Sequence, residues 1–229
     1  MTSTTQHRSI EIGPLPNPLD PGVLRLLAQA EPATIGHFRE HGFIHRRVKA
    51  LNSVQRTVGT AVTVRLHGLD GSVLHHALGQ LRPGDFLVVD RDGDDTIACI
   101  GGASALAASV RGAAGIIVDG CVTDIQELRE IGLPIWARGL SARTTRSEGL
   151  RGAFCVPVSC GGVTVRPGDA VLADENGILV LPPDEIESAA LQAIALQERE
   201  KETLIKLRNG QTYPEILGTT LHYTTRATS

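Results

Sequence analysis

Aromatic side chains are scarce in this sequence of 229 residues, with one Trp, two Tyr and four Phe making up 3% of it. This scarcity excludes a surface of stacked aromatic rings that would bind bases or sugars. Cationic side chains are not in excess either, because 22 Lys and Arg stand against 25 Asp and Glu, a formal net charge of −3. This charge balance argues against a general electrostatic affinity for nucleic acid or for an anionic membrane.

Long apolar runs are also missing. The longest, at 115–118 and 178–181, fall far short of the roughly 20 residues that span a bilayer, and residues 1–13 lack the apolar segment of a secretory signal.

No C-x-x-C pair occurs, which favours buried, reduced thiols over disulfides or a zinc site. With 41% apolar and 21% charged residues, we expect a soluble, cytoplasmic globular protein. Four cysteines lie in apolar segments: Cys99, Cys121, Cys155 and Cys160.

The chain is expected to divide into a polar N-terminal arm (1–19) on the surface, a single domain (20–210) and a C-terminal tail (211–229). Within the domain, short apolar strands alternate with helical patterns, which indicates an α/β fold with partly parallel strands. A long helix is predicted over 184–209, ended by Gly210. Its apolar side and charged middle predict that it leaves the domain body and packs on a neighbouring subunit.

Local signals predict the first elements of the domain. Asp20 and Pro21 begin a helix, because Asp is a good N-cap and Pro fits the first turn. Thr34 is expected to cap a second short helix that stops at Gly42. From Thr57 the apolar residues recur with a period of two, which is typical of a half-buried strand.

A nine-residue pattern occurs twice, at 82–90 and at 166–174. Each copy begins with Arg-Pro-Gly-Asp, continues as an apolar strand and ends in an acidic turn that a further strand follows. The pattern predicts two similar β-hairpins. The acidic turns lack the twelve-position spacing of an EF-hand, so we interpret them as turns rather than as calcium loops.

Two segments are candidates for chemistry. In the first, Gly101 and Gly102 precede a helix that continues through Ala103 and Ser104, and the free amides of such a helix start can bind a carboxylate or a phosphate. This segment has neither a P-loop nor a complete dinucleotide-binding motif.

The second candidate segment follows the apolar strand at 115–118. Asp119 ends that strand and is typical of a turn, and Asp124 begins another helix. Asp124 and Glu127 have the spacing of a capping box. The simpler interpretation of Asp124 is therefore that its side chain caps its own helix.

Taken together, these motifs resemble the RraA-like family. They are Gly-Asp-x-Leu-Val-Val-Asp, then Gly-Gly, then Gly-x-x-Gly-Ile-Ile-Val-Asp-Gly-x-x-x-Asp, then Pro-Val-x-x-Gly-Gly-Val-x-Val-x-Pro-Gly-Asp, and the resemblance runs from about Ala33 to Gly210. The family includes class II 4-hydroxy-4-methyl-2-oxoglutarate and 4-carboxy-4-hydroxy-2-oxoadipate aldolases, and inhibitors of a bacterial endoribonuclease. The resemblance implies a swivelling β/β/α domain that assembles as a homotrimer or a hexamer, with active sites between subunits.

The resemblance also implies roles for particular residues. In the aldolases an Asp that matches Asp124 ligates Mg²⁺ or Mn²⁺ together with ordered waters, and amides that match 101–104 hold the pyruvyl carboxylate. The metal polarises the pyruvyl carbonyl and stabilises an enolate. Acidic residues of a neighbouring subunit's C-terminal helix hold the metal's waters, and the candidates here are Glu202 or Glu198.

The sequence departs from the aldolases at two positions. Thr123 replaces the Arg that contacts the pyruvyl oxygens, and Gly102 stands where many aldolases carry an acidic residue. Losing a charged donor to an oxyanion costs about 10²–10³ in rate. The inhibitors differ in the opposite way, because they typically keep the Arg and lose the Asp that matches Asp124.

We therefore expect a divalent-metal-dependent lyase that acts on a small 2-oxo acid, by aldol cleavage that releases pyruvate or by oxaloacetate-type decarboxylation, with a substrate altered by Thr123. The alternative is a non-catalytic regulator that binds a macromolecular partner. Two further features are open: the pair His75-His76 is interpreted as surface or interface histidines, and Arg143 or Arg146 of the following loop could replace the missing Arg.

Overall fold

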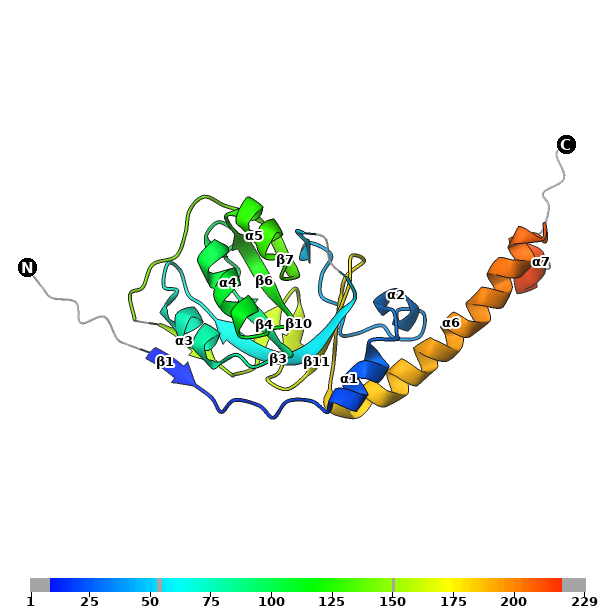
Figure 1. The fold of residues 1–229 in the computed structure, drawn as a ribbon, viewed down its shortest axis with the longest axis horizontal. Coiled ribbons are helices and arrows are strands. Elements are labelled where there is room, and N and C mark those ends of the chain that lie inside the picture. Colours follow the sequence, from blue (N-terminus) through cyan, green and yellow to red (C-terminus); the bar gives the residue numbers. More distant parts are fainter. Residues whose placement is uncertain (1–8, 53–54, 150, 220–229) are drawn as a thin grey trace, which may run out of the picture.

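The computed structural model describes residues 9–52, 55–149 and 151–219. Four parallel strands form the centre of its main sheet, in the order β3, β4, β6, β7, and three helices connect them on one face (Figure 1). This arrangement confirms the predicted α/β fold with parallel pairing. The strands are β3 (Thr57–Arg65), β4 (Asp85–Asp90), β6 (Gly115–Val122) and β7 (Ile135–Leu140), and the helices are α3 (Ser72–Gln80), α4 (Gly102–Val110) and α5 (Ile125–Ile131).

Shorter strands extend the sheet at both edges. β8 (Arg151–Phe154) runs antiparallel to β3 and parallel to β1 (Ser9–Ile12). The arm predicted to lie on the surface therefore contributes a strand through residues 9–12, while residues 1–8 lie outside the described part. The other strands are β2 (Lys49–Ala50) beside β7, β5 (Ala98–Ile100) beside β6, β11 (Ala170–Ala173) beside β3, β12 (Ile178–Leu181) beside β11, and the separate pair β9 (Val158–Cys160) and β10 (Val163–Val165).

The hydrophobic core has a layer on each face of this sheet, because successive side chains of a strand point to opposite faces. Leu87 and Ile116 pack under the three helices, whereas Phe86 and Ile117 pack with strands β9 to β12 on the other face. Burial on both faces also explains why β3 differs from the predicted half-buried strand: its residues 59–64 are all buried.

The repeated nine-residue pattern forms one hairpin and not two. In the second copy β11 and β12 pair antiparallel, as predicted, with Ala170 opposite Leu181. In the first copy β4 pairs in parallel with β3 and β6, and β5 pairs with β6, so the predicted hairpin is wrong. The repeat persists in the turns, because the amide of Arg82 donates to Asp85 and that of Arg166 to Asp169, both at 2.8 Å.

Outside the sheet, α1 (Pro21–Leu27) begins as predicted, with amides of its first turn donating to Asp20 Oδ1. The second helix, α2 (Pro32–Ile35), contains Thr34 instead of being capped by it and ends well before Gly42. Pro32 explains this start, because Pro is favoured in the first turn of a helix.

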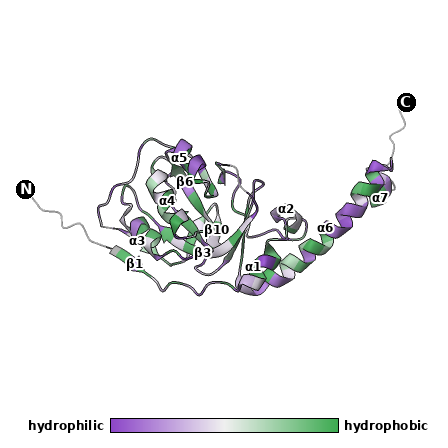
Figure 2. Ribbon diagram, viewed as in Figure 1, coloured by the Kyte–Doolittle hydropathy of each residue, from purple (hydrophilic) through white to green (hydrophobic). Residues whose placement is uncertain are grey.

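The long C-terminal helix α6 (Ile186–Arg208) follows a 3₁₀ turn (Pro183–Glu185) and projects from the domain, with α7 (Tyr213–Leu217) after it (Figures 1 and 2). Its first turns are buried against α1 and α2. Leu204 and Ile205, near its far end, are 42% and 55% exposed. The packing of this end on a neighbouring subunit stays a prediction, as does the predicted tail, of which 220–229 lie outside the described part.

Among the described residues, no helix combines the length and the apolar character needed to cross a membrane. All four cysteines are buried free thiols, as predicted. Burial raises the pKa of Cys99 to about 12 and that of Cys155 to about 11.

Candidate functional site

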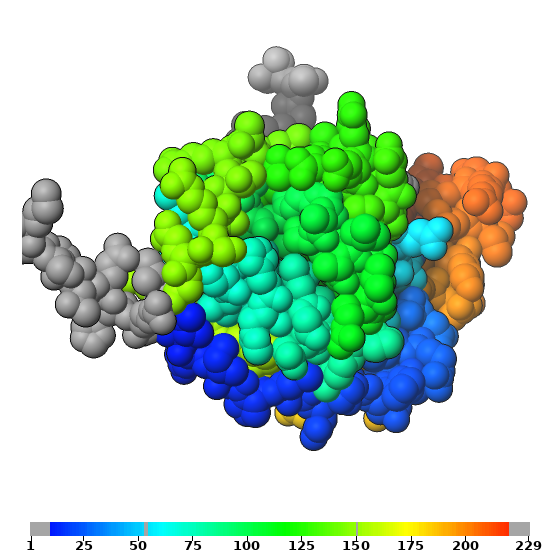
Figure 3. All heavy atoms as spheres, turned by 60° about the vertical axis from the view of Figure 1, so that its left-hand side comes forward, coloured from blue at the N-terminus to red at the C-terminus, as the bar shows by residue number. Residues whose placement is uncertain are grey.

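A cavity of about 800 Å³ lies where β5 and β6 end, beside α3 and α4. The carboxyl ends of parallel strands are the usual place for ligand sites in open α/β sheets. Figure 3 looks onto this face, where α3 (teal) and α4 (green) lie side by side with the loop that follows β7 (yellow-green) next to them. The lining includes His75, Leu78, Gly101, Ala103, Ser104, Leu106, Val110, Arg111, Thr123, Asp124, Thr144 and Thr145. Of the predicted substrate-binding residues, all but the buried Gly102 thus share one cavity with Asp124.

Asp124 does not cap its own helix with its side chain. Its backbone is left-handed (φ 55°, ψ 42°), and its carboxylate accepts no hydrogen bond from the amides of α5. Instead, the amide of Gly102 donates to Oδ2 at 3.0 Å and the hydroxyl of Thr123 donates to Oδ1 at 3.2 Å. The capping-box interpretation of Asp124 is therefore wrong, because the left-handed backbone turns the side chain towards the start of α4.

This backbone conformation is uncommon for a residue other than glycine, although Asp tolerates it better than most. The carbonyl of Asp124 still accepts the first hydrogen bond of α5, from the amide of Leu128 at 3.0 Å. The helix thus begins at the predicted place while the carboxylate is exposed at the cavity. Residues held in sparsely populated conformations are concentrated at functional sites.

The start of α4 uses two of its four amides internally. The hydroxyl of Ser104 accepts from the amide of Gly101 at 2.8 Å and donates to its carbonyl at 2.9 Å, and the amide of Gly102 donates to Asp124. In the described part of the chain, no protein acceptor is recorded for the amides of Ala103 and Ser104. These two amides are therefore the ones that can hold a substrate carboxylate at this helix end.

Both glycines at this helix start make room for carboxylates. A Cβ atom on Gly101 would lie 3.0 Å from Cγ2 of Thr123 and would crowd the carboxylate of Asp124. A Cβ atom on Gly102 would overlap Oε2 of Glu127 and lie 2.8 Å from its Cδ. The carboxylates of Asp124 and Glu127 thus both approach the first turn of α4.

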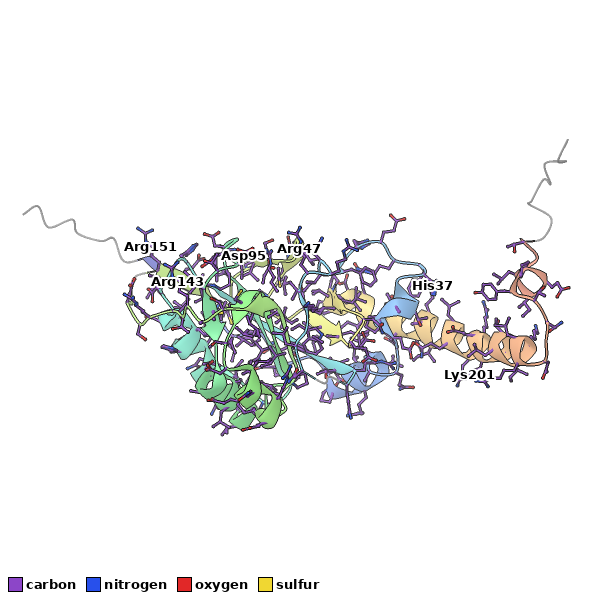
Figure 4. The ribbon with its side chains drawn as sticks, turned by 90° about the horizontal axis from the view of Figure 1, so that it is seen from above. His37, Arg47, Asp95, Arg143, Arg151 and Lys201 are labelled. Carbon is purple, nitrogen blue, oxygen red and sulfur yellow. The ribbon has the colours of Figure 1, made fainter. Side chains whose placement is uncertain are left out.

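The loop arginines proposed to replace the missing Arg lie outside this cavity. The cavity is lined instead by Thr144 and Thr145. Arg143 lines a separate cavity together with Arg151, and Figure 4 places Arg143 on the side of the domain away from the three helices. In this chain neither Arg143 nor Arg146 takes the place of the Arg that Thr123 replaces.

Glu202 also lies outside the chain's own cavity. It is exposed on the projecting part of α6, next to Lys201, which Figure 4 labels far from the three helices. Glu198, the other candidate, is paired with Lys201 at 2.6 Å. A role for Glu202 at the site requires a second copy of the chain and stays a prediction.

His75 lines the cavity, which the sequence reasoning missed. Its Nδ1 is 3.2 Å from the hydroxyl of Ser147. His76 points elsewhere and packs edge-on against Phe154, with 5.2 Å between ring centroids. Helical periodicity could have separated the two histidines, because adjacent residues of a helix do not share a face whereas residues four apart do. In the structure His75 lines the cavity together with Gly79, four residues further on.

Asp119 has a structural role inside β6 and not in the predicted turn, because the strand continues to Val122. Its carboxylate accepts from Nε of Arg138 at 2.5 Å and from the amide of Gly161 at 2.9 Å. The hydrogen bond to Asp119 is the first cause that raises the pKa of Arg138. Asp119 therefore ties β6 to β7 and to the turn after β9, and it is not available as a ligand in the cavity.

The donors at the cavity suit a hard divalent cation. Within the described residues, no group of three or more His, Cys, Asp and Glu side chains converges as a closed metal site. The cavity offers the exposed Asp124 carboxylate, with Glu127 against the same helix start. Mg²⁺ is typically bound through one or two carboxylates and keeps several waters, so these donors fit Mg²⁺ or a similar cation rather than zinc.

Comparisons with known proteins agree on one family. The sequence pattern described as RraA-like (aldolase/RraA) matches residues 31–180. A Thermus thermophilus protein named 4-hydroxy-4-methyl-2-oxoglutarate aldolase is 35% identical over 134 residues, which cover 58% of this chain and 80% of that one. A Halalkalibacterium halodurans protein provisionally given the same name is 36% identical over 146 residues, covering 64% of this chain and 69% of its own length.

A solved structure supports the same fold. Streptomyces coelicolor RraAS2, described as an unusual member of the RNase ES inhibitor RraA protein family, superposes with a TM-score of 0.74 at 27% identity. The match covers 82% of this chain and 99% of that one. The relatives thus include proteins named as aldolases and a protein described as an unusual member of a family of ribonuclease inhibitors.

Proposed function

This chain belongs to the RraA-like family, and on that premise we propose that it is a divalent-metal-dependent lyase acting on a small 2-oxo acid. The reaction is aldol cleavage that releases pyruvate, or decarboxylation of an oxaloacetate-like acid. One observation carries the proposal: Asp124 adopts a left-handed backbone, makes no side-chain hydrogen bond to the amides of its own helix and exposes its carboxylate in the cavity. A residue needed only as a helix cap would not adopt this conformation.

Separate residues around the cavity would bind the cation and the substrate. Asp124 would hold Mg²⁺ or Mn²⁺ together with waters, and the amides of Ala103 and Ser104 would bind the substrate carboxylate at the positive end of α4. When bound, the cation polarises the 2-oxo group and stabilises the negative charge that develops when the carbon–carbon bond breaks. Thr123 orients Asp124 through its hydroxyl, and His75 is a titratable group on the cavity wall.

An altered substrate follows from the lining. Thr123 brings no charge where the aldolases of the family carry Arg, and Leu78, Leu106 and Val110 give the cavity an apolar wall. Arg111, at the far end of α4, also lines the cavity, and its Nε donates to the carbonyl of Leu81 at 2.9 Å. This apolar wall favours a 2-oxo acid that presents some apolar surface to the cavity.

A homotrimer or a hexamer is part of this proposal. Leu106 and Val110 on α4 are 52% and 77% exposed beside the cavity, and Leu204 and Ile205 are exposed on α6. A second copy of the chain would cover such surfaces and bring Glu202 to the waters of the cation. A cytoplasmic location is also proposed, since four buried free thiols suit a reducing compartment.

The second candidate is a non-catalytic regulator of a macromolecular partner. It is favoured by Thr123, which lacks the charge that stabilises an enolate, and by the similarity to RraAS2 over nearly all of that protein. Retention of the Asp124 carboxylate in the cavity favours the lyase.

A coupled assay for pyruvate release, run on a panel of 2-oxo acids with Mg²⁺ or Mn²⁺ and then with a chelator, tests the proposal. We expect turnover of at least one acid that the chelator abolishes and that Asp124→Asn removes. No turnover of any acid by folded protein with either cation would favour the regulator instead.

A further inference from the structure

We propose that His75 is the proton-transfer residue of the cavity, which takes the proton of a substrate hydroxyl and gives a proton to C3 of the pyruvate enolate. The inference rests on the proposed function, because it assigns one step of that reaction to a side chain of the cavity wall. It leaves the cation to Asp124 and gives His75 the acid–base chemistry alone.

Both reactions of the proposed function need a proton at the same carbon. In aldol cleavage of a 4-hydroxy-2-oxo acid the C3–C4 bond breaks, the C4 hydroxyl loses its proton to become a carbonyl, and the electron pair of the bond forms the enolate of pyruvate. In decarboxylation of an oxaloacetate-like acid the same bond breaks, C4 leaves as CO₂ and the same enolate remains. Pyruvate forms when C3 gains a proton, and general acid–base catalysis of such a step is worth about 10²–10⁴-fold in rate.

One imidazole side chain balances the protons of either reaction. In the cleavage, neutral imidazole takes the hydroxyl proton as the C3–C4 bond breaks and returns it to C3, so that no proton is gained or lost. In the decarboxylation, protonated imidazole gives its proton to C3 and regains one from water. Histidine suits both directions because this side chain exchanges protons in the neutral pH range.

Four titratable side chains line the cavity, those of His75, Cys99, Arg111 and Asp124, and three of them are unsuited to this step. Asp124 is the proposed ligand of the cation. Burial raises the pKa of Cys99 to about 12, so this thiol holds its proton at neutral pH. Arg111 follows the last residue of α4, and a guanidinium stays charged throughout the working pH range. His75 is therefore the side chain of the lining that can both accept and donate a proton.

The loop that follows β7 ties α3 to β5, the strand that leads into the substrate-binding segment. In this loop the amide of Thr145 donates to the carbonyl of Ala98 in β5 at 3.0 Å. The carbonyl of Arg146 accepts from the amide of Gly71, which directly precedes α3, at 2.7 Å. Because both hydrogen bonds involve one loop, the helix that carries His75 is fixed relative to the substrate-binding segment.

The ring of His75 has one nitrogen engaged and one available. Its Nδ1 lies 3.2 Å from the hydroxyl of Ser147, a contact that orients the ring. Within the described part of the chain, no hydrogen-bond partner of Nε2 is recorded, and the side chain is exposed at the cavity that Ala103 and Ser104 also line. Nε2 is therefore the atom that exchanges a proton with the substrate, and its access to water lets it regain one.

The test follows the exchange of the methyl protons of pyruvate for deuterium in D₂O by proton NMR, at saturating Mg²⁺. This exchange forms the enolate and returns a proton to C3, so it measures the proposed step with pyruvate alone. His75→Ala should stay folded, because Ala is the best helix former and the side chain that it replaces is exposed. We expect the exchange rate to fall by about 10²–10⁴-fold and added imidazole to restore part of it.

Two controls separate proton transfer from other roles of the residue. His76→Ala removes the neighbouring imidazole, which packs on Phe154 and does not line the cavity, and should exchange pyruvate protons at the wild-type rate. His75→Ala should bind Mn²⁺ as tightly as the wild type, measured from the spin-resonance signal of free Mn²⁺, because His75 is not a ligand of the cation. Thermal melting checks that each variant is folded.

Several results would overturn the inference in distinguishable ways. Wild-type exchange in His75→Ala, together with lost exchange in Asp124→Asn, would remove His75 from proton transfer and leave the proposed function standing. A loss that imidazole does not relieve, or weaker Mn²⁺ binding by His75→Ala, would give His75 a structural or ligand role instead. Turnover of a 2-oxo acid by a wild type that exchanges no pyruvate protons would overturn the inference alone, and the absence of both would overturn the proposed function as well.

Discussion

Thr123→Arg tests whether this site keeps the geometry of the family's aldolases and lacks only their cationic donor. Thr123 lines the cavity, and its hydroxyl is already engaged by Asp124 Oδ1 at 3.2 Å. The wild-type site therefore offers the substrate no charged donor from this position. A donor aimed at a developing oxyanion is worth about 10²–10³ in kcat, or roughly 2.7–4 kcal/mol of barrier.

The structure indicates that the new side chain has room. The cavity measures about 800 Å³, and the loop beside Thr123 contributes Thr144 and Thr145 to it while Arg143 lines a different cavity. An introduced guanidinium therefore meets no loop arginine that would repel it. Loss of the Thr123 hydrogen bond costs about 1 kcal/mol of stability, which is small enough for the variant to stay folded.

The assay is oxaloacetate decarboxylation at saturating Mg²⁺ or Mn²⁺, with Thr123→Gln as the long, polar and uncharged control. We expect Thr123→Arg to raise the rate by up to about 10²–10³ and Thr123→Gln to leave it near the wild-type value. A folded Thr123→Arg protein whose decarboxylation rate is unchanged or lower would contradict this prediction. It would show that the cavity suits a substrate whose reaction needs no arginine side chain at position 123.

Other predictions concern stability, thiol chemistry and assembly. The guanidinium of Arg91 is fully buried and pairs with Asp94 at 2.9 Å. Asp94→Asn should therefore lower the free energy of unfolding, measured by urea titration, by about 3–5 kcal/mol. A loss under about 1 kcal/mol would contradict this prediction. Burial raises the pKa of Asp94, but hydrogen bonds from Thr96 and Arg91 outweigh it and hold that pKa lowered. The stabilisation is therefore present above about pH 4 and lost as the pH falls through the lowered pKa, an acid-dependent loss that Asp94→Asn should lack. All four cysteines are buried, and burial raises the pKa of Cys99 to about 12 and that of Cys155 to about 11. A thiol reagent at pH 8 should therefore label none of them until the protein unfolds. Rapid labelling of the native protein would be inconsistent with their burial. Light scattering should give three or six times the chain mass of 24.3 kDa, and a monomer would remove the intersubunit role of Glu202.

The periodic patterns of the sequence predicted most of the fold. The helix at Asp20, the strand at Thr57 and the long helix up to Gly210 follow from capping residues and apolar periods, which are local signals. Strand partners were less predictable. The two copies of the repeated pattern have nearly the same turns, but β4 lies in the centre of the sheet and pairs with β3 and β6, which long-range packing decides.

The sequence predicted which segments form the site but not how their side chains are arranged. The sequence placed 101–104 and Asp124 at one site, and the structure brings both to one cavity. The capping box failed because the spacing of Asp124 and Glu127 says nothing of the left-handed backbone that turns the Asp124 side chain away from α5. The approach of Glu127 to Gly102 joins two elements and leaves no local signal.

The proposed lyase requires Asp124 to bind a divalent cation, and calorimetric titration of Mn²⁺ into the wild type and Asp124→Asn tests this requirement most directly. Asn begins a helix about as well as Asp and can accept the same hydrogen bond from Gly102, so the variant should melt close to the wild type. We expect saturable binding by the wild type and none by Asp124→Asn. Equal binding by the two proteins, or none by either, would contradict the metal-dependent lyase.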